Sequence, residues 1–367
     1  MAAKSKRGVW ILVLLLIIVG GVFLLFVRGT KQDLGEDARE DIRYRLKWLA
    51  NVGFVGDLYA DTYGFFLEEG LRVKVRPGGP EHNAIRELET GEAHFGVASA
   101  DQVLRALDKK ADVVVIAQIY RSNPVQWIYR SEKISIKQPS DLKAQRVGIT
   151  IGDNDETIMY GLLNKYGIDH VKPGDTTKKT GNTSPVILDG VHFDFLPFTK
   201  GKVSLFPVYK NTQGVDLRRQ LEAEGEQVAF FNPDVFGIRF VANSIVTTSR
   251  MVRDKGPLVR CFLKAVLKGW RHALDPKNED LAVRAMLRFV AENEPEAGDA
   301  LNDKLREQLA VTRELVLPEA GSRAPLGTID VQAWKQTEGL MLQLNLIGNK
   351  VGIEGYLRTD LPLANSK

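Results

Sequence analysis

The segment VVVIAQIYRSNPVQWIYR, residues 113–130, decides the fold class. Residues 113–119 form a near-continuous apolar run, the break YRSNP follows at 120–124, and a second apolar run occupies 125–129. A strand that is apolar on both faces is typical of a sheet covered by helices on both sides. The break therefore predicts that the chain leaves one α/β sheet here and begins another.

Strands and helices alternate on the N-terminal side of this segment. The predicted elements are a strand at 44–49, a helix at 56–69, a strand at 71–76, a helix at 83–90, a strand at 94–98 and a helix at 100–109. Gly70 ends the first helix, and the turn PGGP at 77–80 ends the second strand. Such strand–helix–strand crossovers are the connections that parallel strands require.

The C-terminal side predicts a second lobe and a return to the first. Strands are expected at 125–129, 146–151 and 203–206, a helix at 154–166, and from 238 onward mainly helices, at 257–274, 280–292, 298–314 and 331–346. We expect these late helices to pack onto the first sheet. Lobe 1 would then comprise 44–122 and 238–362, and lobe 2 would comprise 123–237.

Two proline-containing segments, near 120–124 and 232–237, would connect the lobes. A pair of connections is a two-segment hinge, and a hinge between two α/β sheets places a closable cleft at their strand ends. A single continuous α/β domain is the alternative.

The N-terminus predicts a membrane anchor. Residues 9–27 are nineteen uncharged residues, and at about 1.5 Å per helical residue they span a hydrocarbon core of roughly 30 Å. Residues 1–8 form a basic stub that positive charge should hold in the cytoplasm, and 28–43 form a polar tether. This predicts a single-pass protein of the cytoplasmic membrane with its folded part on the periplasmic or extracellular side. A cleaved signal peptide is the alternative.

The charge and the cysteine content exclude several functions. The net charge is +4, but residues 1–31 hold five positive charges and no acid, which leaves −1 for the rest. We therefore expect no nucleic-acid partner. Cys261 is the only cysteine and lies on an apolar helical face, and the five histidines have no metal-ligand spacing, so we expect neither a zinc site nor a cofactor.

Several motifs in this order resemble a known family. They are GFFLEEGLRV at 64–73, GGP at 78–80, GEAHFGVA at 91–98, IKQPSDLK at 136–143, RVGI at 146–149, FLKA at 262–265 and KGW at 268–270. The chain resembles, over about 44–360, the periplasmic binding proteins for nitrate, sulfonates and thiamine precursors, which share a fold with pyrimidine-precursor synthases. The resemblance implies a type II periplasmic-binding fold and delivery of a small molecule to an ABC permease in the inner membrane, without a reaction.

The sequence also departs from that family. Residues 49–54, LANVGF, stand where the family often has a turn containing proline and glutamine, which leaves the ligand unassigned. The glutamate expected after Asn211 is Gln213 at best. The resembling synthases use a cysteine-rich iron site, so a chain with one cysteine is not expected to be an enzyme.

Candidate binding residues lie where strands end and helices begin, because unpaired backbone N–H groups and helix dipoles point there. They are Trp48, Asn51, Phe54, Ser99, Asp101, Tyr120, Asp153, Phe206, Tyr209 and Asn211. Six of them have an alternative structural role: core packing for the tryptophan and the phenylalanines, helix capping for Ser99 and Asp153, and linker packing for Tyr120.

The acids among these residues indicate the class of ligand. Asp101, Asp153, Asp155 and Glu156 occupy helix N-termini that would otherwise attract an anion. We therefore expect a neutral or weakly basic, planar nitrogenous molecule similar to a thiamine precursor, bound by a monomer. Binding of nitrate or an alkylsulfonate, and a ligand-sensing ectodomain that signals through a membrane partner, are the alternatives.

Overall fold

A computed structural model describes residues 41–361 except 80, 176–183, 193, 291–297 and 318–323. The predicted basic stub, the membrane anchor and most of the tether lie outside the described residues. No helix within the described ranges is both long enough and apolar enough to cross a membrane. The described residues belong to one compact unit that begins at Asp41.

The first sheet has five strands in the order β2 (Arg72–Arg76), β1 (Asp41–Arg45), β3 (Phe95–Ala98), β11 (Ser244–Thr247) and β4 (Val114–Gln118). β1 runs parallel to β2 and β3, with Tyr44 opposite Phe95, whereas β11 is antiparallel to β3 and β4. β1 begins three residues before the predicted strand, within the predicted tether. All five residues of β4 are buried, as its apolar run predicts.

β11 was not predicted, because the chain after 238 was expected to be mainly helical. Its four residues are all buried, so they show no alternation of apolar and polar side chains. Its partners, β3 and β4, lie more than a hundred residues earlier in the chain. This insertion makes the first lobe discontinuous within the sheet itself.

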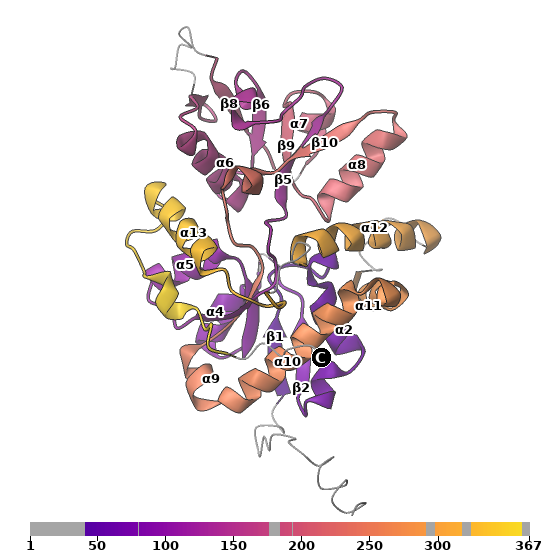
Figure 1. The fold of residues 1–367 in the computed structure, drawn as a ribbon, viewed down its shortest axis with the longest axis vertical. Coiled ribbons are helices and arrows are strands. Elements are labelled where there is room, and N and C mark those ends of the chain that lie inside the picture. The colour runs from indigo at the N-terminus through magenta and orange to yellow at the C-terminus, as the bar shows by residue number, and fades with distance from the viewer. Residues whose placement is uncertain are drawn as a thin grey trace, which may run out of the picture. The chain divides into compact units, whose positions relative to one another are not determined.

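The second sheet has six strands in the order β10 (Val228–Phe231), β5 (Val125–Arg130), β9 (Leu205–Tyr209), β6 (Arg146–Ile149), β8 (Val186–Gly190) and β7 (His170–Val171). β5 is antiparallel to both of its neighbours, and β6 is parallel to β8 and β9. Figure 1 shows this sheet above the first one. Two separate sheets confirm the predicted two-lobed α/β fold.

Helices in the first lobe follow the predicted pattern with one break. They are α2 (Val55–Thr62), α3 (Phe65–Glu68), α4 (Ala84–Thr90), α5 (Ala100–Asp108), α9 (Ser249–Asp254) and α10 (Gly256–Leu274). The helix predicted at 56–69 is divided into α2 and α3, because Gly64 adopts a left-handed φ of 73°. α2 crosses α10 closely at Gly56, where a Cβ atom would lie 2.1 Å from the Trp270 ring.

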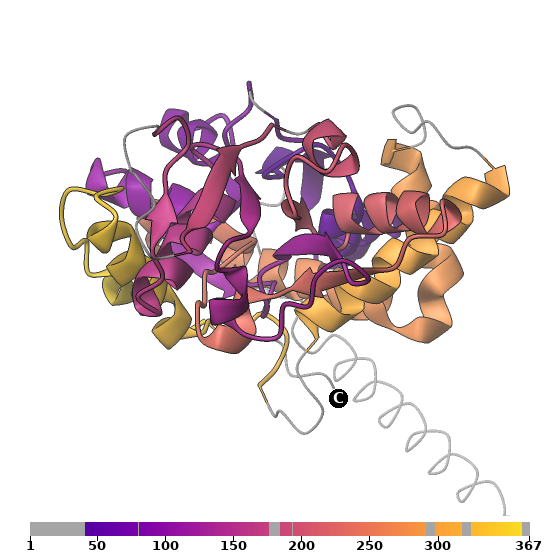
Figure 2. The ribbon, with the colours of Figure 1, turned by 90° about the horizontal axis from the view of Figure 1, so that it is seen from above.

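The sequence predicted that the last helices pack onto the first sheet. In the structure they contact both lobes. α11 (Glu279–Val290), α12 (Gly298–Val316) and α13 (Val331–Gln343) follow α10. α12 packs against α8 (Gln213–Ala223) of the second lobe, and α13 packs against both α5 and α6 (Asn154–Lys165). Figures 1 and 2 place α12 and α13 on opposite sides of the molecule.

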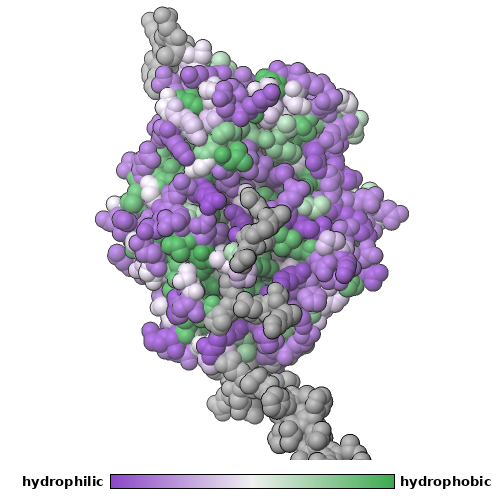
Figure 3. Space-filling view, in the orientation of Figure 1, coloured by the Kyte–Doolittle hydropathy of each residue, from purple (hydrophilic) through white to green (hydrophobic). Residues whose placement is uncertain are grey.

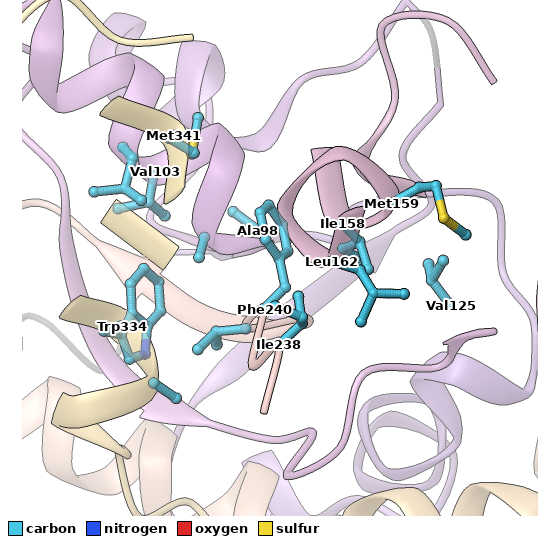
Figure 4. Close-up of a cluster of buried hydrophobic side chains, with 14 of the residues drawn as sticks. Ala98, Val103, Val125, Ile158, Met159, Leu162, Ile238, Phe240, Trp334 and Met341 are labelled. Atoms are coloured by element: carbon cyan, nitrogen blue, oxygen red, sulfur yellow. The ribbon is translucent and has the colours of Figure 1, made fainter. Parts of the chain in front are cut away.

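A buried apolar cluster continues from one lobe to the other. Figure 4 shows Val103 of α5 and Met341 of α13 on one side and Ile158 of α6 on the other, with Ile238 and Phe240 of the second connection between them. Gly161 of α6 approaches α13 so closely that a Cβ atom there would lie 2.5 Å from Leu340. The lobes therefore share part of their core.

The two segments predicted to connect the lobes are hydrogen-bonded to each other. Ser122 Oγ and the Asn123 amide both donate to Asp234 Oδ2, at 2.6 and 2.9 Å. Asn123 Nδ2 donates to the Phe240 carbonyl at 2.6 Å, and the Ile119 amide donates to the Asn243 carbonyl at 3.1 Å. Each segment supplies hydrogen-bond partners for the other, so the two connections form one hydrogen-bonded pair.

The face shown in Figure 3 is mostly hydrophilic, with apolar side chains in smaller patches. Exposed large apolar side chains in the described ranges include Trp48, Leu49 and Ile151. Trp48 and Leu49 follow β1, and Ile151 follows β6. The strand ends of both lobes thus present apolar groups to solvent, next to the polar side chains described below.

Candidate ligand-binding site

A pocket lies at the carboxyl ends of β6, β8 and β9 in the second lobe. It encloses about 360 Å³ of space, part of it open to solvent, and is lined by Val125, Thr150, Asp153, Asp155, His192, Phe206, Pro207, Val208, Tyr209 and Gln213. Ligands of open α/β sheets bind outside the carboxyl ends of parallel strands. Three of the predicted residues, Asp153, Phe206 and Tyr209, therefore share one pocket.

The loop between β6 and α6 forms the acidic wall of this pocket. Asp153 caps α6, with its Oδ1 accepting from the Asn154 amide at 2.7 Å. Asp155 Oδ2 accepts from the Thr150 amide at 2.6 Å, and Glu156 Oε2 accepts from the Gly152 amide at 2.7 Å. The capping role predicted for Asp153 is present, and its carboxylate also lines the pocket.

Asp155 differs from Asp153 because it is almost fully buried. Burial raises the pKa of Asp155 to about 8, and the charge of Asp153 adds to the rise, although the Thr150 amide opposes it. Asp155 is therefore mostly protonated at neutral pH, and as a carboxylic acid it can donate a hydrogen bond as well as accept one. The pocket wall thus carries fewer negative charges than its sequence suggests.

The aromatic residues of the pocket have different environments. Phe206 is 2% exposed and packs edge-on against Phe195 at 5.7 Å between ring centroids, so most of its surface serves the core of the second lobe. Tyr209 ends β9 and is half-buried. Burial raises the pKa of Tyr209, Asp153 and Asp101 raise it further, and Lys47 opposes them. Of the two aromatic residues in the pocket, Tyr209 is thus the one that has a hydroxyl and lies near the first lobe.

Polar residues of the first lobe face this pocket. Lys47 follows β1 and Asp101 lies in the first turn of α5 after β3, and β1 and β3 are parallel neighbours. Lys47 Nζ lies 6.0 Å from the centroid of the Tyr209 ring. Asp101 Oδ1 accepts from Ser99 Oγ at 2.5 Å, and Gln102 Oε1 accepts from the Ser99 amide at 3.2 Å, so the predicted capping of α5 is present.

Lys47 was missing from the sequence-based candidates. The strand predicted at 44–49 included it as an ordinary strand residue, but β1 ends at Arg45 and places Lys47 in the loop beyond it. Asp155 was recognised only as a helix-capping acid, and Thr150, His192 and Gln213 were not selected. The sequence offered one signal for Lys47: a charged residue stands next to an aromatic one, Trp48, at the end of a buried strand.

Tyr120 and Asn211 form a buried bridge between the lobes beside the pocket. Asn211 Nδ2 donates to the Tyr120 hydroxyl at 3.0 Å and to Thr312 Oγ1 of α12 at 2.9 Å. The Tyr120 hydroxyl in turn lies 3.4 Å from the Gly53 carbonyl. Both side chains are at most 2% exposed, so their polar groups serve the bridge.

The three candidates that follow β1 lie outside the pocket lining. Asn51 Oδ1 accepts from the Gly53 amide at 2.7 Å and caps a short 3-10 helix, Val52–Phe54. Phe54 is 3% exposed and belongs to the core, whereas Trp48 is 42% exposed. Of these three, Trp48 has free surface for a ligand.

Among the described residues, no group of three or more His, Cys, Asp or Glu side chains is placed to hold a metal ion. Cys261 is buried on α10, and burial raises the pKa of its thiol. A low thiol pKa is what makes a cysteine a nucleophile. The environment of Cys261 therefore favours an apolar packing role.

Two α/β lobes joined by two paired connections, with a polar pocket at their strand ends, define the class of periplasmic-binding-protein-like folds. The chain belongs to the NMT1/THI5-like family, whose model matches residues 51–279.

Relatives and solved structures agree with this assignment. The chain is 24% identical over 319 residues to the riboflavin-binding protein RibY of Chloroflexus aurantiacus, covering 86% of this chain and 84% of the relative. It is also 24% identical over 325 residues to the formylaminopyrimidine-binding protein of Halalkalibacterium halodurans, covering 85% and 88%. The crystal structure of the periplasmic aliphatic sulphonate binding protein SsuA of Escherichia coli matches with a TM-score of 0.63 and 14% identity, over 89% of this chain and 94% of that one.

Proposed function

We propose that this protein is the substrate-binding component of an ABC importer and holds a small, planar, nitrogen-containing molecule between its lobes. The observation that carries the proposal is that Lys47 of the first lobe lies 6.0 Å from the ring centroid of Tyr209, which lines the second-lobe pocket together with Asp153. Carboxylates accept from N–H groups, and Tyr209 offers both an aromatic face and a hydroxyl. These groups match the edge and the face of a heteroaromatic ring.

The charge of the cleft favours this ligand over an anion. Asp153 lines the pocket and Asp101 lies in the first turn of α5 in the facing lobe, and both carboxylates would repel a sulfonate or a nitrate. The named relatives bind riboflavin and a formylaminopyrimidine, which are planar nitrogen heterocycles. We therefore favour a ligand of that chemical class, with a thiamine-precursor-like pyrimidine as the first candidate.

The proposal includes a location and partners. Residues 9–27 would anchor the chain in the cytoplasmic membrane, with the lobes on the periplasmic or extracellular side as a monomer. There the two lobes would deliver the bound ligand to a permease in the same membrane. Lobe 1 comprises 44–122 and 238–362, and lobe 2 comprises 123–237. The proposal assigns no catalytic role, because the groups that line the pocket suffice for recognition.

Ligand-dependent stabilisation tests the ligand class. The full chain, purified in mild detergent, would be heated with the formylated aminomethylpyrimidine, with riboflavin and with an alkylsulfonate. A ligand at one hundred times its Kd stabilises the folded state by about 2.7 kcal/mol, so a rise in Tm with one of the heterocycles is expected. A rise with the sulfonate alone would contradict the proposed class.

Uptake separates transport from sensing. Deleting the gene for this chain in its host should abolish uptake of the ligand that stabilises the purified protein. Unchanged uptake, together with a changed transcriptional response to the same ligand, would instead assign the chain to ligand sensing.

A further inference from the structure

Lys47 lies between carboxylates that belong to different lobes. Its ammonium nitrogen lies 6.0 Å from the centroid of the Tyr209 ring, and Tyr209 lines the second-lobe pocket together with Asp153. Asp101 begins α5 of the first lobe, whereas Asp153 caps α6 of the second. The Lys47 side chain therefore extends from the first lobe to the aromatic and acidic wall of the second-lobe pocket.

The backbone around Lys47 is closely supported from behind. The Gly78 amide donates to the Trp48 carbonyl at 2.9 Å, and the Leu46 amide donates to the Arg76 carbonyl at 2.9 Å. A Cβ atom at Gly78 would lie 2.2 Å from the Leu46 carbonyl oxygen and 2.7 Å from the Lys47 carbonyl carbon. This close backing holds the backbone at Lys47 against the end of β2 and the turn at Gly78.

The charges of the cleft require a cation at this position. Asp101 and Asp153 repel each other when the lobes bring them together, and the repulsion grows as water is excluded. Burial lowers the pKa of Lys47, but Tyr209 and the two carboxylates outweigh this and raise the pKa above the ordinary value. The side chain therefore stays charged at neutral pH and offsets the repulsion.

We propose that Lys47 is the resident cation of the cleft, so that the site accepts a neutral ligand rich in N–H donors and rejects a cation of the same shape. The inference rests on the proposed function, because it concerns the ligand of that site. A neutral ligand donates to Asp101 or Asp153 while Lys47 remains in place. A cationic ligand has to displace the ammonium group or bind beside it, and either costs affinity.

The first experiment needs no ligand. Lys47→Ala removes three methylene groups and the ammonium group, which n-propylammonium replaces. The Tm of the full-length Lys47→Ala variant should rise in n-propylammonium chloride relative to sodium chloride at equal ionic strength. Lys74→Ala is the matched control, because Lys74 also pairs with an aspartate, Asp41 at 2.8 Å, but on the exposed surface.

The control and the wild-type chain should show no such difference between the two salts. An equal response of Lys47→Ala, Lys74→Ala and wild type would overturn the assignment of Lys47 as a resident cation.

The second experiment compares two ligands that share a pyrimidine ring and differ in charge. The formylated aminomethylpyrimidine is neutral at neutral pH, whereas the same molecule without the formyl group carries a charged primary amine. Wild type should prefer the neutral compound, and Lys47→Arg should keep this preference. Lys47→Met should shift the ratio of the two Kd values toward the cation by at least about tenfold, which corresponds to about 1.4 kcal/mol. An unchanged ratio in Lys47→Met would overturn the inference.

The two experiments separate the inference from the proposed function. If neither pyrimidine binds any variant, the proposed pyrimidine class is wrong, and the n-propylammonium experiment still decides the role of Lys47. If Lys47→Ala does not fold, the comparison of the two ligands in the bulkier Lys47→Met variant decides the role of Lys47.

Discussion

Asn211 of the second lobe donates a hydrogen bond of 3.0 Å to the hydroxyl of Tyr120, which lies in the first connection between the lobes. The same amide nitrogen donates to Thr312 of α12, so one side chain joins the second lobe to two separate parts of the chain. All three residues are buried. A buried polar group that loses its partner is costly, so this bridge stabilises one arrangement of the lobes.

Asn211→Ala should lower the free energy of unfolding by about 1–3 kcal/mol, because it leaves the buried Tyr120 and Thr312 hydroxyls without this donor. Urea unfolding measures the loss. Gln220→Ala, which removes an exposed amide from α8, should change the stability by less than about 0.5 kcal/mol. In a double-mutant cycle, strict additivity of Asn211→Ala and Tyr120→Phe would contradict a direct bridge.

Asp155 should make the stability of the ligand-free protein fall as the pH rises. Its folded pKa of about 8 lies above the unfolded value of 3.8, so between these values the folded state keeps a proton that the unfolded state has lost. Each pH unit in that window then costs about 1.4 kcal/mol.

Asp155→Asn keeps the acceptor for the Thr150 amide and removes the titration. The stability difference between variant and wild type should therefore grow in favour of the variant from pH 5 to pH 8, in urea unfolding at each pH. Parallel pH profiles of the two proteins would show that Asp155 titrates at its ordinary value.

Gly56→Ala should destabilise the protein severely, because the new Cβ would lie 2.1 Å from the Trp270 ring and force α2 and α10 apart. Overpacking of this kind costs about 1–3 kcal/mol or more. Gly339→Ala is the matched control at an exposed position of α13, where a Cβ meets nothing within 4 Å. It should stabilise by about 0.5–1 kcal/mol. Thermal unfolding distinguishes the two, and similar Tm values would contradict the close crossing.

Asp153→Asn should weaken ligand binding about tenfold or more without unfolding the protein, because asparagine also caps a helix but offers the ligand no charged acceptor. Isothermal titration calorimetry with the ligand that stabilises wild type measures the change. Asp330→Asn is the control, since Asp330 caps α13 by accepting from Ala333 and does not line the pocket. Equal affinities of wild type and Asp153→Asn would remove Asp153 from the site.

Much of the fold could be predicted because its signals are local. The apolar run that became β4, the break at 120–124 and the new strand β5 are features of neighbouring residues. Capping of α5 by Ser99 and of α6 by Asp153 depends on the first turn of each helix. Boundaries were less accurate, because β1 covers Asp41–Arg45 whereas the sequence predicted a strand at 44–49.

The site was predicted in part for the same reason. Asp153, Phe206 and Tyr209 share a pocket because strand ends of one parallel sheet meet at one edge, which a sequence can indicate. Asn211 and Tyr120 were selected as ligand-binding residues, but their polar groups bond to each other across the lobes. Nothing in the neighbourhood of either residue in the chain could indicate that partner.

The sequence by itself determined much of the alternation of strands and helices, the division into two lobes and many of the residues at the strand ends, because periodicity, capping and turn chemistry act between neighbours in the chain. The tertiary structure alone decided that β11 enters the first sheet, that α12 and α13 contact the second lobe, and that Lys47 meets Tyr209. β11 pairs with strands more than a hundred positions earlier in the chain, and the other contacts join residues of different lobes, so no pattern among neighbouring residues indicates them.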